Sequence, residues 1–96
     1  MRTKGRTDAN QTVIVETLRA IGASVISLAN IGNGCPDLLV GYHGKTYLLE
    51  VKTPCGKLTP DQVEFIDRWD GADVVIVRSP GYAIEVVSKG LEEWIL

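Results

Sequence analysis

The sequence lacks the features that mark several large classes of protein. No apolar run approaches the ~20 residues that a membrane-spanning helix needs, and the basic first six residues are not followed by the apolar segment of a secretion signal. Two cysteines among 96 residues are too few for a disulfide framework, and they lack the CxxC spacing of zinc sites. These absences favour a cytoplasmic protein with reduced thiols and no membrane partner.

The chain also lacks the strong positive charge of many nucleic-acid-binding proteins. Its formal net charge is −2, with basic residues in the first six positions and acidic ones gathered between positions 61 and 73. A length of 96 residues with 45% hydrophobic content indicates one globular domain. We expect a flexible basic tail at 1–7 and a single domain at 8–96. A domain this small has a modest core, to which a dimer interface could add burial.

Apolar periodicity and turn residues predict a mixed α/β fold, with a sheet flanked by helices on both faces. The expected elements are a helix at 9–21, strands at 24–28, 37–41 and 45–53, a helix from 60, a strand at 73–78 and a last helix at 82–89, with a tail at 91–96. In the first helix, capped by Asp8, a buried stripe should contain Ile14, Leu18 and Ile21 with Val13 alongside.

The second half of the chain carries clear helix and strand signals. Thr59 should cap a helix that has Pro60 at its first position. Its buried face should be formed by Val63, Ile66 and Trp69. The nearly unbroken apolar run at 73–78 is typical of an interior strand that is covered on both faces.

One hairpin is the most informative feature. His43-Gly44 suits a tight two-residue turn, because glycine tolerates the positive φ that such turns need. That turn places Asp37 directly opposite Glu50, where Cβ atoms are ~4.5–5.5 Å apart. Lys52 shares a strand face with Glu50, because side chains alternate along a strand.

Two like charges so placed repel each other unless something positive lies between them. A hard divalent cation held by oxygen atoms, with Lys52 beside it, fits this arrangement. The single histidine, His43, is at the far end of the hairpin, which argues against a zinc site with Cys35 and Cys55. Taken singly, the acids and the lysine could also be ordinary solvated residues of a turn and a strand edge.

Pro36-Asp37 followed by Glu50-Val51-Lys52 resembles the PD-(D/E)XK nuclease signature. More narrowly, the chain resembles the small stand-alone VRR-NUC domains, many of them phage-encoded. The matching stretches are Gly34-Cys35-Pro36-Asp37-Leu38-Leu39-Val40, Leu49-Glu50-Val51-Lys52 and Lys57-Leu58-Thr59-Pro60-Asp61-Gln62. The resemblance covers nearly the whole chain and implies a restriction-endonuclease-like αβββαβ core that hydrolyses phosphodiester bonds.

The resemblance implies catalytic roles for Asp37, Glu50, Lys52 and Gln62. Asp37 and Glu50, with the backbone carbonyl of Val51, would hold Mg²⁺ or Mn²⁺, and Lys52 would position or deprotonate the attacking water. Gln62 lies near the active site in the similar family. It also fits a capping box with Thr59, and the two roles are compatible.

The first helix departs from the family pattern. Many members carry a glutamate there that helps to hold a metal, and Gln11 occupies that position here. Gln11 is either a weak contributor to the site or a helix-start residue. The candidate phosphate contacts are Lys57, Lys45, Arg6 and Lys4, which would add affinity without sequence specificity.

The resemblance implies a substrate as well. Stand-alone members point to four-way (Holliday) junction resolution by a homodimer, because two symmetric cuts match a two-fold axis. One alternative is a general nuclease, or one that cuts flaps or single strands. The alternative from a different class is a catalytically weak nucleic-acid-binding module on the same fold, which the change at Gln11 would favour.

Overall fold

The computed structural model describes the backbone of residues 6–95 and the side chains of residues 9–89. The elements are α1 (Arg6–Ala20), β1 (Ser24–Ser27), β2 (Leu38–Tyr42), β3 (Lys45–Val51), α2 (Pro60–Arg68), β4 (Val74–Val77) and α3 (Pro80–Ile95). No helix in this described part is both long and apolar enough to cross a membrane.

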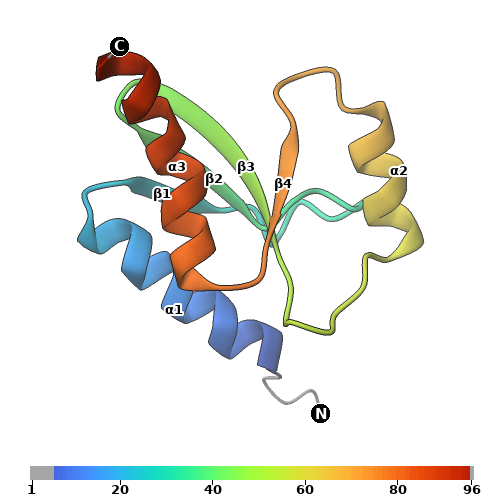
Figure 1. Cartoon of the computed structure of the whole chain (residues 1–96). Coiled ribbons are helices and arrows are strands. Elements are labelled where there is room, and N and C mark those ends of the chain that lie inside the picture. The colour runs from blue at the N-terminus through green and yellow to red at the C-terminus, as the bar shows by residue number, and fades with distance from the viewer. Residues whose placement is uncertain (1–5, 96) are drawn as a thin grey trace.

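The four strands form one mixed sheet in the order β1-β2-β3-β4. The first three strands are antiparallel, and β4 runs parallel to β3 after the crossover through α2. Helices α1 and α3 lie on one face of the sheet, whereas α2 stands on the opposite side and apart from the strands (Figure 1). The predicted α/β class with a mixed sheet is therefore confirmed.

Alternation along the central strands divides the sheet into two different faces. Leu38, Val40, Leu49 and Val51 are fully buried and belong to one core cluster with residues of α1 and α3. The residues between them in sequence point to the opposite face, because successive side chains alternate. That second face carries Glu50, which lies between Leu49 and Val51.

Helix α1 begins three residues earlier than predicted, so Arg6 belongs to the helix and Asp8 lies within its first turn instead of capping it. At the other end, Gly22 has a φ of 96° and donates to the Arg19 carbonyl, while the Ala23 amide donates to the Leu18 carbonyl. This pair of hydrogen bonds is a Schellman motif, which confirms the predicted glycine stop.

The buried stripe of α1 is mostly as predicted. Ile14 and Leu18 are fully buried, and Ile21 packs against the core as a half-buried residue. Val13 is 47% exposed, so its predicted place in the stripe is wrong. Val15 packs against the core instead. Successive residues of an α-helix are rotated by about 100° around its axis, so positions 14 and 18 lie on the same face, while position 13 is turned away from that face.

Three predictions for the second half are corrected. Helix α2 contains no buried residue; Val63 is 52% and Trp69 45% exposed. β4 is an edge strand rather than an interior one, and only Val77 of its four residues is buried. The last helix starts at Pro80 and continues to Ile95, where a tail was expected.

Candidate active site

The β2–β3 hairpin has the register that the sequence predicts. Tyr42 pairs with Lys45 and Leu38 with Leu49, around a turn in which His43 and Gly44 have φ values of 50° and 80°. Positive φ at both central residues is the type I′ geometry that matches the twist of hairpin strands. One further step outward places Asp37 opposite Glu50, on the face of the sheet that α1 and α3 leave uncovered.

Asp37 is fixed by the backbone of the neighbouring strand. Its Oδ2 accepts a hydrogen bond of 2.8 Å from the Val51 N–H, just beyond the last regular pair of the hairpin. In an extended strand, the N–H and C=O of one residue point to the same side. The Val51 carbonyl therefore faces the Asp37 side of β3, where the sequence predicts it as a metal ligand.

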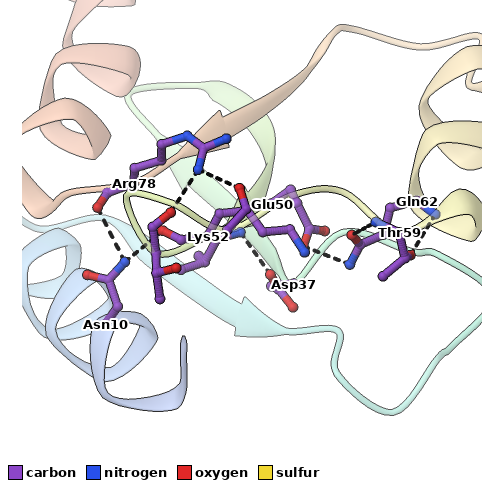
Figure 2. Close-up of polar contacts among 10 residues, drawn as sticks. Asn10, Asp37, Glu50, Lys52, Thr59, Gln62 and Arg78 are labelled. Carbon is purple, nitrogen blue, oxygen red and sulfur yellow. Dashed lines mark hydrogen bonds and ion pairs between the residues drawn. The ribbon is translucent and has the colours of Figure 1, made fainter. Parts of the chain in front are cut away.

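Glu50 is the one charged residue in the described core, with 2% of its surface exposed. Its Oε2 accepts a hydrogen bond of 3.0 Å from Gln62 Nε2 and lies 3.5 Å from Lys52 Nζ (Figure 2). Buried carboxylates are stable only when paired or hydrogen-bonded, and both conditions hold here. The predicted triad of Asp37, Glu50 and Lys52 is brought together.

The carboxylates of Glu50 and Asp37 repel each other electrostatically. Burial raises the pKa of Glu50 from 4.5 to about 7, and the Asp37 carboxylate adds to the rise, while Lys52 opposes it. The same surroundings raise the pKa of the Cys35 thiol, through burial and then through the charges of Glu50 and Asp37. Negative charge is therefore in excess at this point, as a cation-binding site requires.

Gln62 makes the predicted capping box and also contacts the candidate site. Its side-chain oxygen accepts from the Thr59 N–H at 2.9 Å, and its own N–H donates to Thr59 Oγ1 at 3.2 Å, which makes a capping box. Its side-chain nitrogen Nε2 donates to Glu50 Oε2. The start of α2 thus carries a neutral donor directly to the buried carboxylate.

A glycine holds the start of α2 against the loop before β2. Gly34 has a φ of 78°, and a Cβ there would meet the backbone carbonyl of Asp61 and lie 2.9 Å from the Gln62 nitrogen. We expect Gly34→Ala to displace α2 and to lower the free energy of unfolding by about 1–3 kcal/mol. Gly32→Ala is the matched control, because Gly32 has a φ of 76° with open space around it.

Urea unfolding of both variants checks this prediction. The φ penalty is common to the two substitutions, so the difference between them reports the contact with α2. Equal losses of stability in Gly34→Ala and Gly32→Ala would show that the loop and α2 are not tightly packed.

The other predicted residues are placed less centrally. Lys57 is exposed in the segment between Lys52 and α2. Lys45 is at the opposite end of β3, roughly 17 Å along the strand from Glu50 at 3.4 Å per residue. Gln11 is half-buried in α1. Lys4 lies outside the described residues, as does the side chain of Arg6.

Two residues near the triad have no counterpart among the predicted site residues. Asn10 Nδ2 donates to the backbone carbonyls of Lys52 and Arg78, at 2.9 and 3.3 Å. The Arg78 guanidinium contacts carbonyls of the segment after Lys52 (Figure 2). One signal for Arg78 was available, because the residue after β4 must lie beside the residue after β3 in a parallel pair. Contacts to backbone carbonyls otherwise leave no pattern in a sequence.

The donor set fits a hard cation that needs few protein ligands because water fills its remaining coordination positions. Within the described residues, no three His, Cys, Asp or Glu side chains are grouped to hold a metal. Mg²⁺ commonly takes one or two carboxylates and keeps several waters, so Asp37, Glu50 and the Val51 carbonyl form a sufficient set. All of these ligands are oxygens, and two are anionic.

Comparison with known proteins finds similarity at the level of structure. No family model and no curated protein matches the sequence. A solved structure described as a VRR_NUC domain is similar to this chain, with 27% sequence identity and a TM-score of 0.69, over 88% of this chain and 97% of that one. The similarity confirms the predicted resemblance to VRR-NUC domains and the restriction-endonuclease-like fold, and it supports a nuclease domain.

Proposed function

We propose that this nuclease domain is a Mg²⁺- or Mn²⁺-dependent endonuclease that hydrolyses phosphodiester bonds in branched DNA. The observation that carries the proposal is the buried Glu50 carboxylate, placed beside Asp37 and 3.5 Å from the Lys52 ammonium. A buried acid pair with excess negative charge costs stability unless a cation or a proton neutralises it. Asp37, Glu50 and the Val51 carbonyl would hold the cation.

Each residue has a distinct chemical task in this proposal. The bound cation would orient and acidify a water molecule and neutralise charge on the phosphate. Lys52, whose side chain is less buried than that of Glu50, would stabilise negative charge on the phosphorane-like transition state or take a proton from the attacking water. Gln62 holds the Glu50 carboxylate in place through its 3.0 Å hydrogen bond.

DNA would be held mainly through its phosphates. Lys57 is in the segment that leads away from the site, and Lys45, Lys4 and Arg6 are the further candidate contacts. Such contacts give affinity that falls with salt and carries no base specificity. We place this activity in the cytoplasm, where the two free cysteines would stay reduced.

We propose further that the enzyme is a homodimer that resolves four-way junctions. An apolar groove of about 530 Å³ lies on the second face of the sheet, between its strands and α2; its lining includes Leu28, Ile31, Leu39, Leu48, Phe65 and Trp69. Ile31 and Trp69 are 60% and 45% exposed there. A second copy would cover this surface and would supply a second active site related by a two-fold axis.

The dimer is tested by Trp69→Glu. Light scattering should give the wild type twice the 10.4 kDa mass of one chain and the variant the mass of one chain, because a buried charge opposes association. Tyr82→Glu is the control, since Tyr82 is 41% exposed on α3, away from the groove. A monomeric wild type would count heavily against junction resolution.

The substrate is tested with labelled four-way junction, flap, duplex and single-stranded DNA, each with Mg²⁺, Mn²⁺ or EDTA. Symmetric nicks near the crossover of the junction, absent in EDTA, are the expected result. Cleavage of flaps or single strands instead would keep the chemistry and replace the substrate. Binding without cleavage in any metal would favour a catalytically weak binding module, the reading to which Gln11 lends some support.

A further inference from the structure

A short segment after the candidate catalytic lysine is held in shape by one guanidinium group. Arg78 Nη1 lies 2.7 Å from the Thr53 carbonyl oxygen, 2.8 Å from that of Gly56 and 3.3 Å from that of Pro54. The segment closes on itself as well, since the Gly56 amide donates to the Thr53 carbonyl at 3.0 Å. Arg78 follows β4 directly, so it fixes this turn from the neighbouring strand.

Asn10 completes the same arrangement from α1. Its two amide hydrogens reach the carbonyls of Lys52 and Arg78, at 2.9 and 3.3 Å. The Lys52 amide donates to the Val77 carbonyl at 3.0 Å. The backbone of Lys52 is therefore fixed through its N–H by β4 and through its C=O by Asn10 of α1; Figure 2 shows the contact with Asn10.

The fixed segment lies between two donors to one oxygen atom. Lys52 Nζ and Gln62 Nε2 both approach Glu50 Oε2, at 3.5 and 3.0 Å. Residues 53–61 connect these donors, and Thr59 in that stretch caps the helix that carries Gln62. The shape of the turn therefore determines where the Lys52 side chain leaves the backbone and how far the Gln62 side chain can reach.

We propose that Asn10 and Arg78 are positioning residues of the nuclease reaction, which place the Lys52 ammonium by fixing its backbone and the turn that follows it. A lysine side chain has a flexible four-carbon stem, so the backbone decides where its charge can be held. Misplacement of a reacting group by about 1 Å can cost about 10²-fold in rate. This inference rests on the proposed function, because it assigns the two residues to that chemistry.

The first test is Arg78→Met, assayed by single-turnover cleavage at saturating enzyme on whichever of the four DNA substrates the wild type cleaves. We expect the maximal rate to fall by about 10- to 100-fold, with half-saturation changed by less than about twofold. Affinity for Mn²⁺ should also change by less than about twofold, because Asp37 and Glu50 are held by β2 and β3. Asn10→Asp should act in the same direction, since its carboxylate cannot donate to the two carbonyls.

The control is Arg19→Met. Arg19 Nη2 also donates to a backbone carbonyl, that of Val25 at 3.0 Å, but it ties α1 to β1 far from the triad. We expect this variant to lose a similar amount of thermal stability and to keep wild-type cleavage. An equal loss of cleavage in the Arg19 and Arg78 variants would reduce Arg78 to a stabilising residue and overturn the proposal.

A double-mutant cycle tests whether Arg78 acts through Lys52. In a Lys52→Met background, Arg78→Met should slow the residual cleavage by less than about threefold, because the group that it positions is absent. A loss as large as in the wild-type background, or a rise in half-saturation, would show that Arg78 acts independently, as a direct phosphate contact does.

Hydrogen exchange separates failure of this proposal from failure of the proposed function. If the wild type cleaves no DNA, the nuclease function fails, and the turn is judged by the exchange rate of the Gly56 amide. We expect this amide to exchange at least about tenfold faster in Arg78→Met and at the wild-type rate in Arg19→Met. Unchanged exchange in Arg78→Met would overturn the proposed fixation of the turn.

Discussion

Replacing Asp37 by asparagine should reduce metal-dependent cleavage by at least about 10³-fold, because a carboxylate ligand is lost and charge stabilisation by a metal is worth several kcal/mol. The fold should survive the change. An amide oxygen can still accept the 2.8 Å hydrogen bond from the Val51 N–H, so the hairpin keeps its register. Cleavage rate and Mn²⁺ affinity, measured on the same preparation, check the prediction.

Asp67→Asn is the matched control for this experiment. Asp67 is exposed on α2, and it lies outside the candidate site. The control removes the same charge from the same protein, so it corrects for the general electrostatic effect on DNA binding. Wild-type cleavage by Asp37→Asn, or equal losses in both variants, would remove Asp37 from the metal site.

The metal-free protein should lose stability as the pH rises through neutrality, and Glu50→Gln should abolish that loss. The pKa of Glu50 is raised from 4.5 to about 7, chiefly by burial and then by Asp37. Between these values, the folded chain binds a proton that the unfolded chain has released. The resulting stability is fully present below about pH 4.5 and is lost as the pH rises through about 7.

The size of this effect follows from the shift. A rise of this extent corresponds to about 3 kcal/mol across the interval. Glutamine is neutral at every pH and still accepts from Gln62, so Glu50→Gln should be more stable than the wild type at pH 8 and should have a flatter profile. Added Mn²⁺ should stabilise the wild type more at pH 8 than at pH 6, because metal and proton compete for the carboxylate.

Chemical unfolding in EDTA at several pH values between 5 and 8 checks the prediction. Glu16→Gln is the control, because Glu16 is an exposed residue of α1. It should follow the wild-type pH profile. If Glu50→Gln also followed that profile, the Glu50 carboxyl would not carry the extra proton.

The hairpin could be predicted closely from the sequence, because a two-residue turn fixes the pairing of every residue that follows it. His43-Gly44 sets Tyr42 against Lys45, and this register carries Asp37 to Glu50. The cap at Thr59 is also local, since a capping box needs only residues three apart. Both predictions depend on short-range geometry and were correct.

The errors concern contacts that local patterns do not specify. The apolar spacing of Val63, Ile66 and Trp69 predicts a helix face, but it does not state what covers that face, and α2 buries none of them. The apolar run of β4 likewise suits an edge strand with one covered face. The hydrogen bonds that Asn10 and Arg78 donate within the described residues go to backbone carbonyls, which any residue supplies, so no side-chain pairing pointed to them.

The most direct test of the account is the cleavage rate of the wild-type protein as a function of free Mn²⁺, after removal of all metal with EDTA. DNA containing a four-way junction, a flap and single-stranded arms offers the enzyme every substrate considered above. We predict no cleavage in EDTA, a saturable rise with Mn²⁺, and recovery when the metal is restored. Cleavage that persists in EDTA, or no cleavage at any concentration of Mn²⁺ or Mg²⁺, would contradict a metal-dependent site at Asp37 and Glu50.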